Sequence, residues 1–297
     1  RGRDRATGTD GQNASKNIAV LPNRQKTRAA AAAADAVRFL RRCGLRVLAE
    51  TENRDIVDAD EYRSIADGLF AACDAAVVFG GDGTLLRYAV ETAKASLPMI
   101  GVNSGTLGYL AELEQDEIPQ LAALCGNDVR IEERMMLEAS LDGRVIDYAL
   151  NEALISRGAA VRMLEFRLDC DGTAAATYRA DGLILSTPTG STAYAMSAGG
   201  PIVDPRLDAF AACPVCPHAF AAARALVFSP ESVLTATVAA AEPDKILLTC
   251  DGRTVAELQS GDCVSVRRAA LRTQLIRIKK DAFYQTLYKK FNAGRSI

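Results

Sequence analysis

The fold is decided by the stretch Ala75-Ala-Val-Val-Phe-Gly-Gly-Asp-Gly-Thr-Leu-Leu-Arg87. Its five leading apolar residues predict a buried strand over 75–79, the glycines predict a tight turn, and the following residues predict a helix over about 84–95. Glycines let backbone N–H groups approach an anion without obstruction by a Cβ atom, and a helix N-terminus attracts negative charge. The turn therefore suits a phosphate group, although a plain tight turn of an α/β protein is the competing interpretation.

The residues of this turn point to phosphoryl transfer. Asp82 is placed to take a proton from a hydroxyl group, Thr84 is a candidate helix cap, and Arg87 lies one helical turn further on, where it is expected to face phosphate. No Gly-Lys-Ser/Thr follows the glycines, so the Walker phosphate-binding motif is excluded.

Strands and helices alternate on both sides of this stretch. Strands are expected over 17–22, 45–49, 75–79 and 99–102, with helices over 27–43, 61–72 and 84–95. This order predicts parallel βαβ units, in which ligands gather at the carboxyl ends of the strands. The loops 80–83 and 103–108 both leave such ends, so we expect them to line one crevice.

The second half of the chain has a different sequence pattern. After an expected helix over 117–124, strand-like runs are separated by the turns Asp142-Gly143, Asp171-Gly172 and Asp251-Gly252, which predicts a β-rich domain. We expect a flexible leader over residues 1–16, an α/β domain with a parallel, Rossmann-like sheet over 17–130 and a β-rich domain over 131–275. A C-terminal helix within 276–297 is expected to pack back on the first domain.

Composition narrows the classes of function. Of the 297 residues, 49% are hydrophobic and 24% charged, which is typical of a folded globular chain, and the net charge of −2 gives no general basic field for nucleic acid. Since no apolar run reaches the roughly 18 residues of a membrane span, we expect a cytoplasmic protein. The eight cysteines are expected to be free thiols, and Cys213, Cys216 and His218 indicate a tight loop rather than a zinc site.

Two further segments carry polar groups in apolar surroundings. Asn151 and Glu152 interrupt the β run 148–155; either a ligand supplies their partners, or one is exposed and the other is satisfied by backbone. The segment 178–201 leads from a strand into a Pro-Thr-Gly-Ser-Thr turn whose hydroxyl and amide groups suit a ribose or pyrophosphate. Just before that strand, Arg179 and Asp181 either flank the same ligand or form a solvated salt bridge.

Read together, four motifs resemble those of the NAD kinase family, which uses ATP to phosphorylate the 2′-hydroxyl of the adenosine ribose of NAD. They are Gly-Gly-Asp-Gly-Thr, Asn-Ser-Gly-Thr-Leu-Gly-Tyr-Leu, Asn-Glu and Asp-Gly-Leu-Ile-Leu-Ser-Thr-Pro-Thr-Gly-Ser-Thr-Ala-Tyr, in this order and at fitting spacing. The resemblance runs from residue 17 to the C-terminal helix. It implies an active site between the two domains, NAD and ATP as ligands, Mg²⁺ or another divalent cation bound with ATP, and a homodimer or homotetramer.

The resemblance also implies roles for particular residues. Asp82 would be the general base, with nucleotide contacts made by Asp82, Gly83, Arg87, Asn151, Glu152, Arg162, Arg179, Asp181, Thr192, Ala193, Tyr194, Ala195, Met196, Ser197 and Arg253. Two features depart from the family pattern: Arg253 stands where the family often has glutamine, and the loop 218–224 is one residue longer than usual.

Two rival functions remain at this stage. Lipid and sugar kinases share the Gly-Gly-Asp-Gly turn but are not expected to pair it with Asn151-Glu152 and the segment 187–194. A noncatalytic NAD sensor would keep the pocket without turnover, and the intact Asp82 argues against it. The sequence leaves open whether polyphosphate replaces ATP and whether NADH is accepted.

Overall fold

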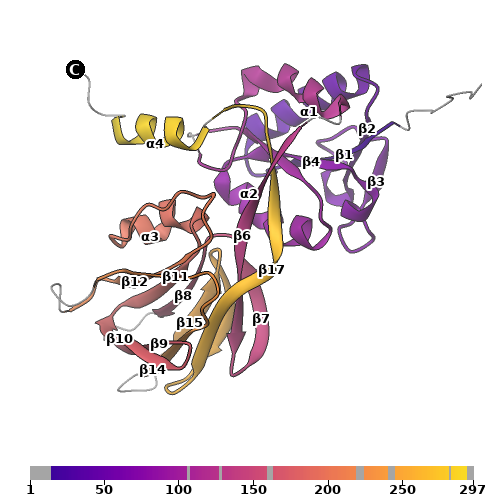
Figure 1. Ribbon diagram of the computed structural model, residues 1–297. Coiled ribbons are helices and arrows are strands. Elements are labelled where there is room, and N and C mark those ends of the chain that lie inside the picture. Colours follow the sequence, from indigo (N-terminus) through magenta and orange to yellow (C-terminus); the bar gives the residue numbers. More distant parts are fainter. Residues whose placement is uncertain are drawn as a thin grey trace, which may run out of the picture.

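The computed structural model describes residues 15–105, 108–126, 129–158, 163–218, 224–239, 245–280 and 282–292 (Figure 1). A mostly parallel α/β domain precedes an antiparallel β-rich domain, which confirms the predicted fold class. The first domain contains β1 (Asn17–Pro22), α1 (Thr27–Arg42), β2 (Arg46–Glu50), η1 (Thr51–Asn53), β3 (Glu61–Arg63), η2 (Phe70–Ala72), β4 (Ala75–Gly80), α2 (Asp82–Lys94), β5 (Met99–Asn103) and η3 (Gln115–Cys125).

The parallel strands are arranged in the order β5-β4-β1-β2-β3. Every residue of β4 is buried, because one hydrophobic cluster containing α1 covers one face of the sheet and another containing α2 covers the other. Val77, in the middle of β4, lies beside Val20 of β1 and Ile100 of β5. The Gly80–Gly83 turn follows directly from this central strand.

Helix α1 packs against the sheet mainly through alanine side chains. Its buried face repeats at helical spacing through Ala29, Ala33, Ala36 and Leu40, and these small side chains let the helix pack close to the sheet. Gly44 follows the helix with φ of 79°, and its left-handed conformation ends the helix as predicted.

The predicted helix over 61–72 is wrong. The first three of these residues form β3, which pairs with β2 at the edge of the sheet, and only Phe70–Ala72 form a short 3₁₀ turn. Gly68 adopts φ of 83°, which interrupts any helix through this segment. The Ser64 hydroxyl accepts a hydrogen bond from the Asp67 N–H and favours a turn instead. The expected helix over 117–124 is the 3₁₀ helix η3, which contains Pro119.

The second domain consists of two sheets. Its elements are β6 (Arg130–Leu141), β7 (Arg144–Ala149), β8 (Glu152–Arg157), β9 (Leu164–Cys170), β10 (Thr173–Ala180), β11 (Gly182–Ser186), η4 (Thr189–Thr192), α3 (Tyr194–Ser197), β12 (Phe210–Val215), β13 (Leu226–Phe228), β14 (Leu234–Ala239), β15 (Ile246–Cys250), β16 (Arg253–Leu258), β17 (Cys263–Arg277) and α4 (Ala282–Asn292). The three Asp-Gly turns have positive φ at both residues, as in type I′ hairpins, which confirms that prediction.

Strand β17 connects the two domains. It pairs with β14 and β6 in the β-rich part and reaches β5 of the parallel part at Leu275 (Figure 1). One sheet therefore continues from the first domain into the second, and a six-stranded sheet in the order β13-β12-β11-β8-β15-β16 packs against it. All eight cysteines lie in the described residues and are free thiols. None of the described helices combines the length and apolar character that crossing a bilayer requires.

Candidate active site

The loops after β4 and β5 meet at Asp82. One carboxylate oxygen of Asp82 accepts a hydrogen bond from the Tyr109 N–H at 2.7 Å, and the other accepts one from the Leu110 N–H at 3.0 Å. Gly108 fits closely against this carboxylate, since a Cβ atom there would lie 2.1 Å from Asp82 Oδ1. The two loops therefore line one crevice, as the order of the strands predicted.

Thr84 has a different role from the predicted one. The residue before α2 is Gly81, and no side chain caps the helix. The Thr84 hydroxyl instead accepts a hydrogen bond from Asn23 Nδ2 at 3.0 Å. Thr84 also fills the space beside Gly80, where a Cβ atom would lie 2.2 Å from its Oγ1. The turn needs glycine at position 80 because Thr84 packs against it.

Asp82 faces a cavity of about 230 Å³ between the domains, which we call the Asp82 cavity. The first domain contributes Asp82, Leu86, Tyr109 and Leu110; the second contributes Arg134, Asn151, Thr189, Thr192, Ala193 and Pro205; helix α4 contributes Phe283 and Lys290. The Phe283 ring lies 6.0 Å from the Tyr109 ring, and Lys290 Nζ lies 4.0 Å from the centre of the Tyr109 ring. Helix α4 thus forms one wall of the cavity.

A second cavity, of about 500 Å³, lies beside the first turn of α2, and we call it the basic cavity. Its cationic lining residues are Arg24, Lys26 and Arg87, and the glycines Gly81 and Gly83 also line it. Arg24 forms an ion pair with Asp55, whereas the Arg87 guanidinium lies 5.6 Å from the centre of the Tyr88 ring. Asp82 and Arg87 therefore face different cavities that adjoin the same helical turn.

Asn151 and Glu152 lie where β7 ends and β8 begins. The carboxylate of Asp251, in the turn between β15 and β16, accepts hydrogen bonds from the backbone N–H groups of Leu150, Asn151 and Glu152 at 2.7, 2.8 and 3.2 Å. These hydrogen bonds fix the backbone conformation between β7 and β8. The Asn151 side of this segment lines the Asp82 cavity. The predicted β run 148–155 is therefore divided between two strands, β7 and β8.

Glu152 carries one of the buried polar atoms that lack a partner among the described residues. Its Oε2 atom is buried and has no hydrogen-bond partner among the described residues. Burial, together with the negative charge of Asp251, raises the pKa of Glu152 to about 7. This carboxyl group therefore changes its charge near neutral pH.

The other predicted residues are distributed over the second domain. Arg179 forms an ion pair with Glu165 at 3.4 Å and Asp181 one with Arg157 at 3.0 Å, so they do not pair with each other, and neither lines the Asp82 cavity. Thr192 and Ala193 line it, Tyr194 is 43% exposed, Ala195 is buried in the core, and Met196 and Ser197 complete the short helix α3. Arg253 pairs with Asp147 at 3.2 Å, and Arg162 lies outside the described residues.

Several lining residues were not among the predicted site residues. Leu86 lies four residues after Asp82, so helical spacing already placed it on the same face. Phe283 and Lys290 are seven residues apart and share a face of α4 for the same reason. Arg134 is 2% exposed and adjoins an apolar strand segment; a charge at such a position is itself a signal.

Arg134 is held by its neighbours at the edge of the cavity. Its Nε donates to Glu132 Oε1 at 2.6 Å, and its Nη1 donates to the Thr189 hydroxyl at 3.2 Å. Burial and the nearby Arg277 guanidinium lower the pKa of Arg134 to about 10, so it stays protonated at neutral pH. The Asp82 cavity therefore combines one carboxylate with two cations, Arg134 and Lys290.

Comparison with known proteins identifies the family. Residues 18–129 match the ATP-NAD kinase N-terminal domain, and residues 150–278 match the ATP-NAD kinase C-terminal domain. The NAD kinase of Desulforamulus reducens is 37% identical, over 92% of this chain and 96% of its own length. NAD kinase 2 of Streptomyces coelicolor is 38% identical, over 94% and 95%.

Solved structures share the fold. Yeast NADH kinase, in a crystal structure complexed with NADH, has a TM-score of 0.85 at 22% identity, covering 96% of this chain and 90% of that one. An NAD kinase from Archaeoglobus fulgidus in complex with ATP has a TM-score of 0.70 at 22% identity, covering 93% and 99%. From the two matching domain models and these relatives, we conclude that the chain belongs to the NAD kinase family and is a phosphotransferase.

Proposed function

We propose that the protein uses ATP to phosphorylate the 2′-hydroxyl of the adenosine ribose of NAD, which gives NADP. The observation that carries this proposal is the Asp82 carboxylate, which faces the cavity between the domains with both oxygens oriented by backbone N–H groups. A hydroxyl bound in this cavity meets a proton acceptor at a fixed position. Such positioning matters most in phosphoryl transfer, which requires little covalent chemistry from the protein.

In this proposal Asp82 is the general base. Its carboxylate takes the proton of the ribose hydroxyl while the hydroxyl oxygen bonds to the γ-phosphorus of ATP and the bond from that phosphorus to ADP breaks. A carboxylate is a weak base toward a hydroxyl, so most of the acceleration has to come from orientation and from positive charge around the phosphoryl group. Arg134 and Lys290 are the cations that line the Asp82 cavity.

NAD is assigned to the Asp82 cavity. About 230 Å³ is less than the roughly 300–1,000 Å³ of a drug-sized ligand site, so the cavity holds only part of a dinucleotide. Asn151, Thr192 and Ala193 line that part, and Tyr194 offers an exposed ring for stacking on a base. Arg179 and Asp181 lie outside this lining, and in this proposal they contact NAD across the subunit interface of a homodimer or homotetramer in the cytoplasm.

ATP is assigned to the basic cavity. Lys26, Gly83 and Arg87 line it, and the N-terminus of α2 adds the partial positive charge of its free N–H groups. Both cavities adjoin the first turn of α2, so this proposal places the donor and the acceptor of the phosphoryl group on either side of Asp82.

A divalent cation fits this arrangement as a companion of ATP. The described residues contain no cluster of three or more His, Cys, Asp or Glu side chains that would form a protein-made metal site. Mg²⁺ commonly binds through one or two carboxylates together with phosphate oxygens, and Asp82 is the carboxylate available in the lining. When bound, the ion offsets negative charge on the phosphates.

The test is one incubation of purified protein with NAD, Mg²⁺ and either ATP or polyphosphate. NADP is measured through a dehydrogenase specific for it, and the two donors decide between ATP and polyphosphate. Loss of general-base catalysis alone lowers the rate by a factor of about 10²–10⁴. The Asp82→Asn variant is therefore expected to lose nearly all turnover while it still binds NAD. NADP formation by neither donor would rule out the proposed function, and near-normal turnover of the variant would rule out the role of Asp82.

A further inference from the structure

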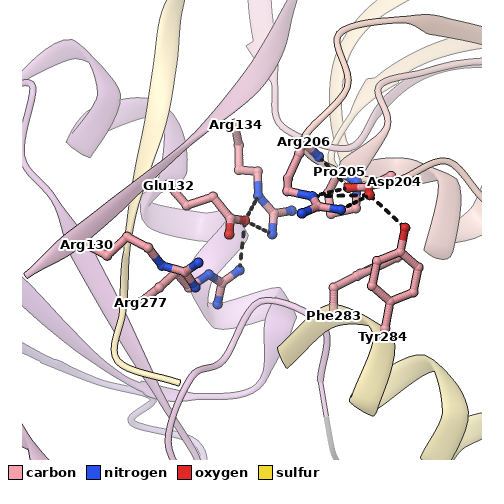
Figure 2. A pocket seen from close by; sticks show the side chains of 9 residues that line it. All are labelled: Arg130, Glu132, Arg134, Asp204, Pro205, Arg206, Arg277, Phe283 and Tyr284. Atoms are coloured by element: carbon pink, nitrogen blue, oxygen red, sulfur yellow. Dashed lines mark hydrogen bonds and ion pairs between the residues drawn. The ribbon is translucent and has the colours of Figure 1, made fainter. Parts of the chain in front are cut away.

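A third cavity adjoins the Asp82 cavity, and we call it the arginine cavity. It measures about 40 Å³ and lies between β6, the segment 204–206, the end of β17 and helix α4 (Figure 2). Arg134, Pro205 and Phe283 line both cavities, so the two cavities adjoin at these residues. The proposed reaction uses Arg134 and gives no role to the other three arginines of this cavity.

Four guanidinium groups gather around the arginine cavity. Arg130, Arg134, Arg206 and Arg277 line it, and Figure 2 shows Glu132 between the pair Arg130 and Arg277 and the side chain of Arg134. Arg134 and Arg277 are 2% and 5% exposed. Buried guanidinium groups retain their charge and require a compensating anion or hydrogen bonds.

The carboxylates nearby do not balance these charges. Glu132 Oε1 is shared, because Arg134 Nε donates to it at 2.6 Å and Arg277 Nη2 lies 3.5 Å from it. Arg277 also pairs with Glu112 at 3.0 Å, and Asp204 pairs with Arg206. Among the residues that the structure describes, three carboxylates thus face four guanidinium groups, which leaves an excess of positive charge in this set.

The hydrogen-bonding groups on the cavity wall support the same conclusion. Arg130 donates from Nη2 to the backbone carbonyl of Lys279 at 3.0 Å, and none of the ion pairs found among the described residues includes it. The lowered pKa of Arg134 is partly caused by the Arg277 guanidinium, as expected for like charges in one buried place. An anion in the cavity would relieve this repulsion.

We propose that the arginine cavity binds a single phosphate group. A buried water needs about 10–15 Å³ on this scale, so 40 Å³ holds roughly three water-sized atoms, which suits the three terminal oxygens of one phosphate group. Planar guanidinium groups recognise such oxyanions through paired, charge-assisted hydrogen bonds. The phosphate is either free orthophosphate or a phosphate group of a nucleotide that reaches in from the Asp82 cavity.

The experiment measures binding of orthophosphate to the full chain by isothermal titration in a chloride buffer. Arg206→Gln and Arg130→Gln each remove one lining charge, and each is expected to weaken binding about tenfold, as for loss of a charge-assisted hydrogen bond. Arg167→Gln is the matched control: Arg167 is 62% exposed against 63% for Arg206, and it too pairs with an aspartate two residues away. The control is expected to bind orthophosphate like the wild type.

Two arms identify the source of the phosphate. The titration is repeated with saturating NAD and with saturating NADP; competition by NADP alone assigns the cavity to the 2′-phosphate, whereas unchanged binding assigns it to free orthophosphate. Absence of wild-type binding at concentrations well above a Kd of about 1 mM, or unchanged binding by both cavity variants, would overturn the proposal. Because the readout is binding, its result is independent of whether the protein phosphorylates NAD.

Discussion

Gly108→Ala tests whether the loop after β5 positions Asp82. A Cβ atom at residue 108 would lie 2.1 Å from Asp82 Oδ1, and contacts under 3.0 Å are essentially never found for real Cβ atoms. The carboxylate or the loop must therefore move by about 1 Å, a displacement that can cost about 10² in rate, or roughly 2.7 kcal/mol of transition-state stabilisation. The loop also carries the Tyr109 and Leu110 N–H donors, so either movement disturbs the hydrogen bonds that orient Asp82.

The assay is NADP formation at several NAD and ATP concentrations, and the matched control is Gly105→Ala. Gly105 lies in the same loop, but its Cβ atom would come no closer than 3.8 Å to a neighbouring atom, at Lys26 Nζ. We expect kcat/KM to fall about a hundredfold for Gly108→Ala and to stay near wild type for Gly105→Ala. If the two variants had the same kcat/KM, the reasoning from Asp82 positioning would be refuted.

Three further predictions concern charged side chains. Lys290→Met is expected to raise the KM for NAD about tenfold, because it removes a charge-assisted contact in the cavity lining. Lys289 lies outside the lining, so Lys289→Met should leave this KM unchanged. Equal KM values for the two variants would contradict the assignment of Lys290. The pKa of Glu152 is raised to about 7 in the folded protein, so the folded state favours the protonated carboxyl group. The protein is therefore expected to lose free energy of unfolding as the pH rises from about 4.5 through 7 and Glu152 becomes charged. Glu152→Gln should recover about 2–3 kcal/mol at pH 8, measured as thermal unfolding against pH, and an unchanged pH profile would refute this. Arg253→Gln should change unfolding free energy by less than about 1 kcal/mol in urea denaturation, because its ion pair with Asp147 is half-exposed; a larger loss would mean that Arg253 has a buried role.

The sequence predicted those parts of the site that depend on local pattern. The strand, glycine turn and helix around Asp82 follow from a short apolar run and from glycine, and the meeting of the two loops follows from the parallel order of the strands. The predicted helix over 61–72 was wrong because Gly68 adopts a left-handed conformation, which the spacing of the apolar residues does not reveal. Local pattern therefore identified the Gly80–Gly83 turn better than the edge of its sheet.

The walls of the cavity depended on contacts across the chain. Asp82 and Lys290 are far apart in the sequence but line the same cavity. Helical spacing can indicate which residues share a face of α4, but it cannot indicate what that face covers. Arg134 became a lining residue because β6 pairs along β17 and brings it beside Thr189. The family assignment, in turn, removes the lipid kinase, sugar kinase and noncatalytic sensor alternatives that the glycine turn alone had left open.

Glu152 and Asp251 are two further carboxyl groups near Asn151 of the Asp82 cavity, and both are weaker candidates for the base than Asp82. Asp251 is buried and its oxygens already accept three backbone N–H groups, so its carboxylate serves to shape the chain at Asn151. Glu152 has a pKa of about 7, which would suit a base, yet among the described residues the lining of the Asp82 cavity includes Asn151 and not Glu152. Geometry has to precede pKa in choosing a base, because a proton moves only over hydrogen-bond distance. The turnover of Glu152→Gln separates the two: if Glu152 were the base, this variant would lose its turnover, whereas Asp82 as the base predicts that the variant keeps it.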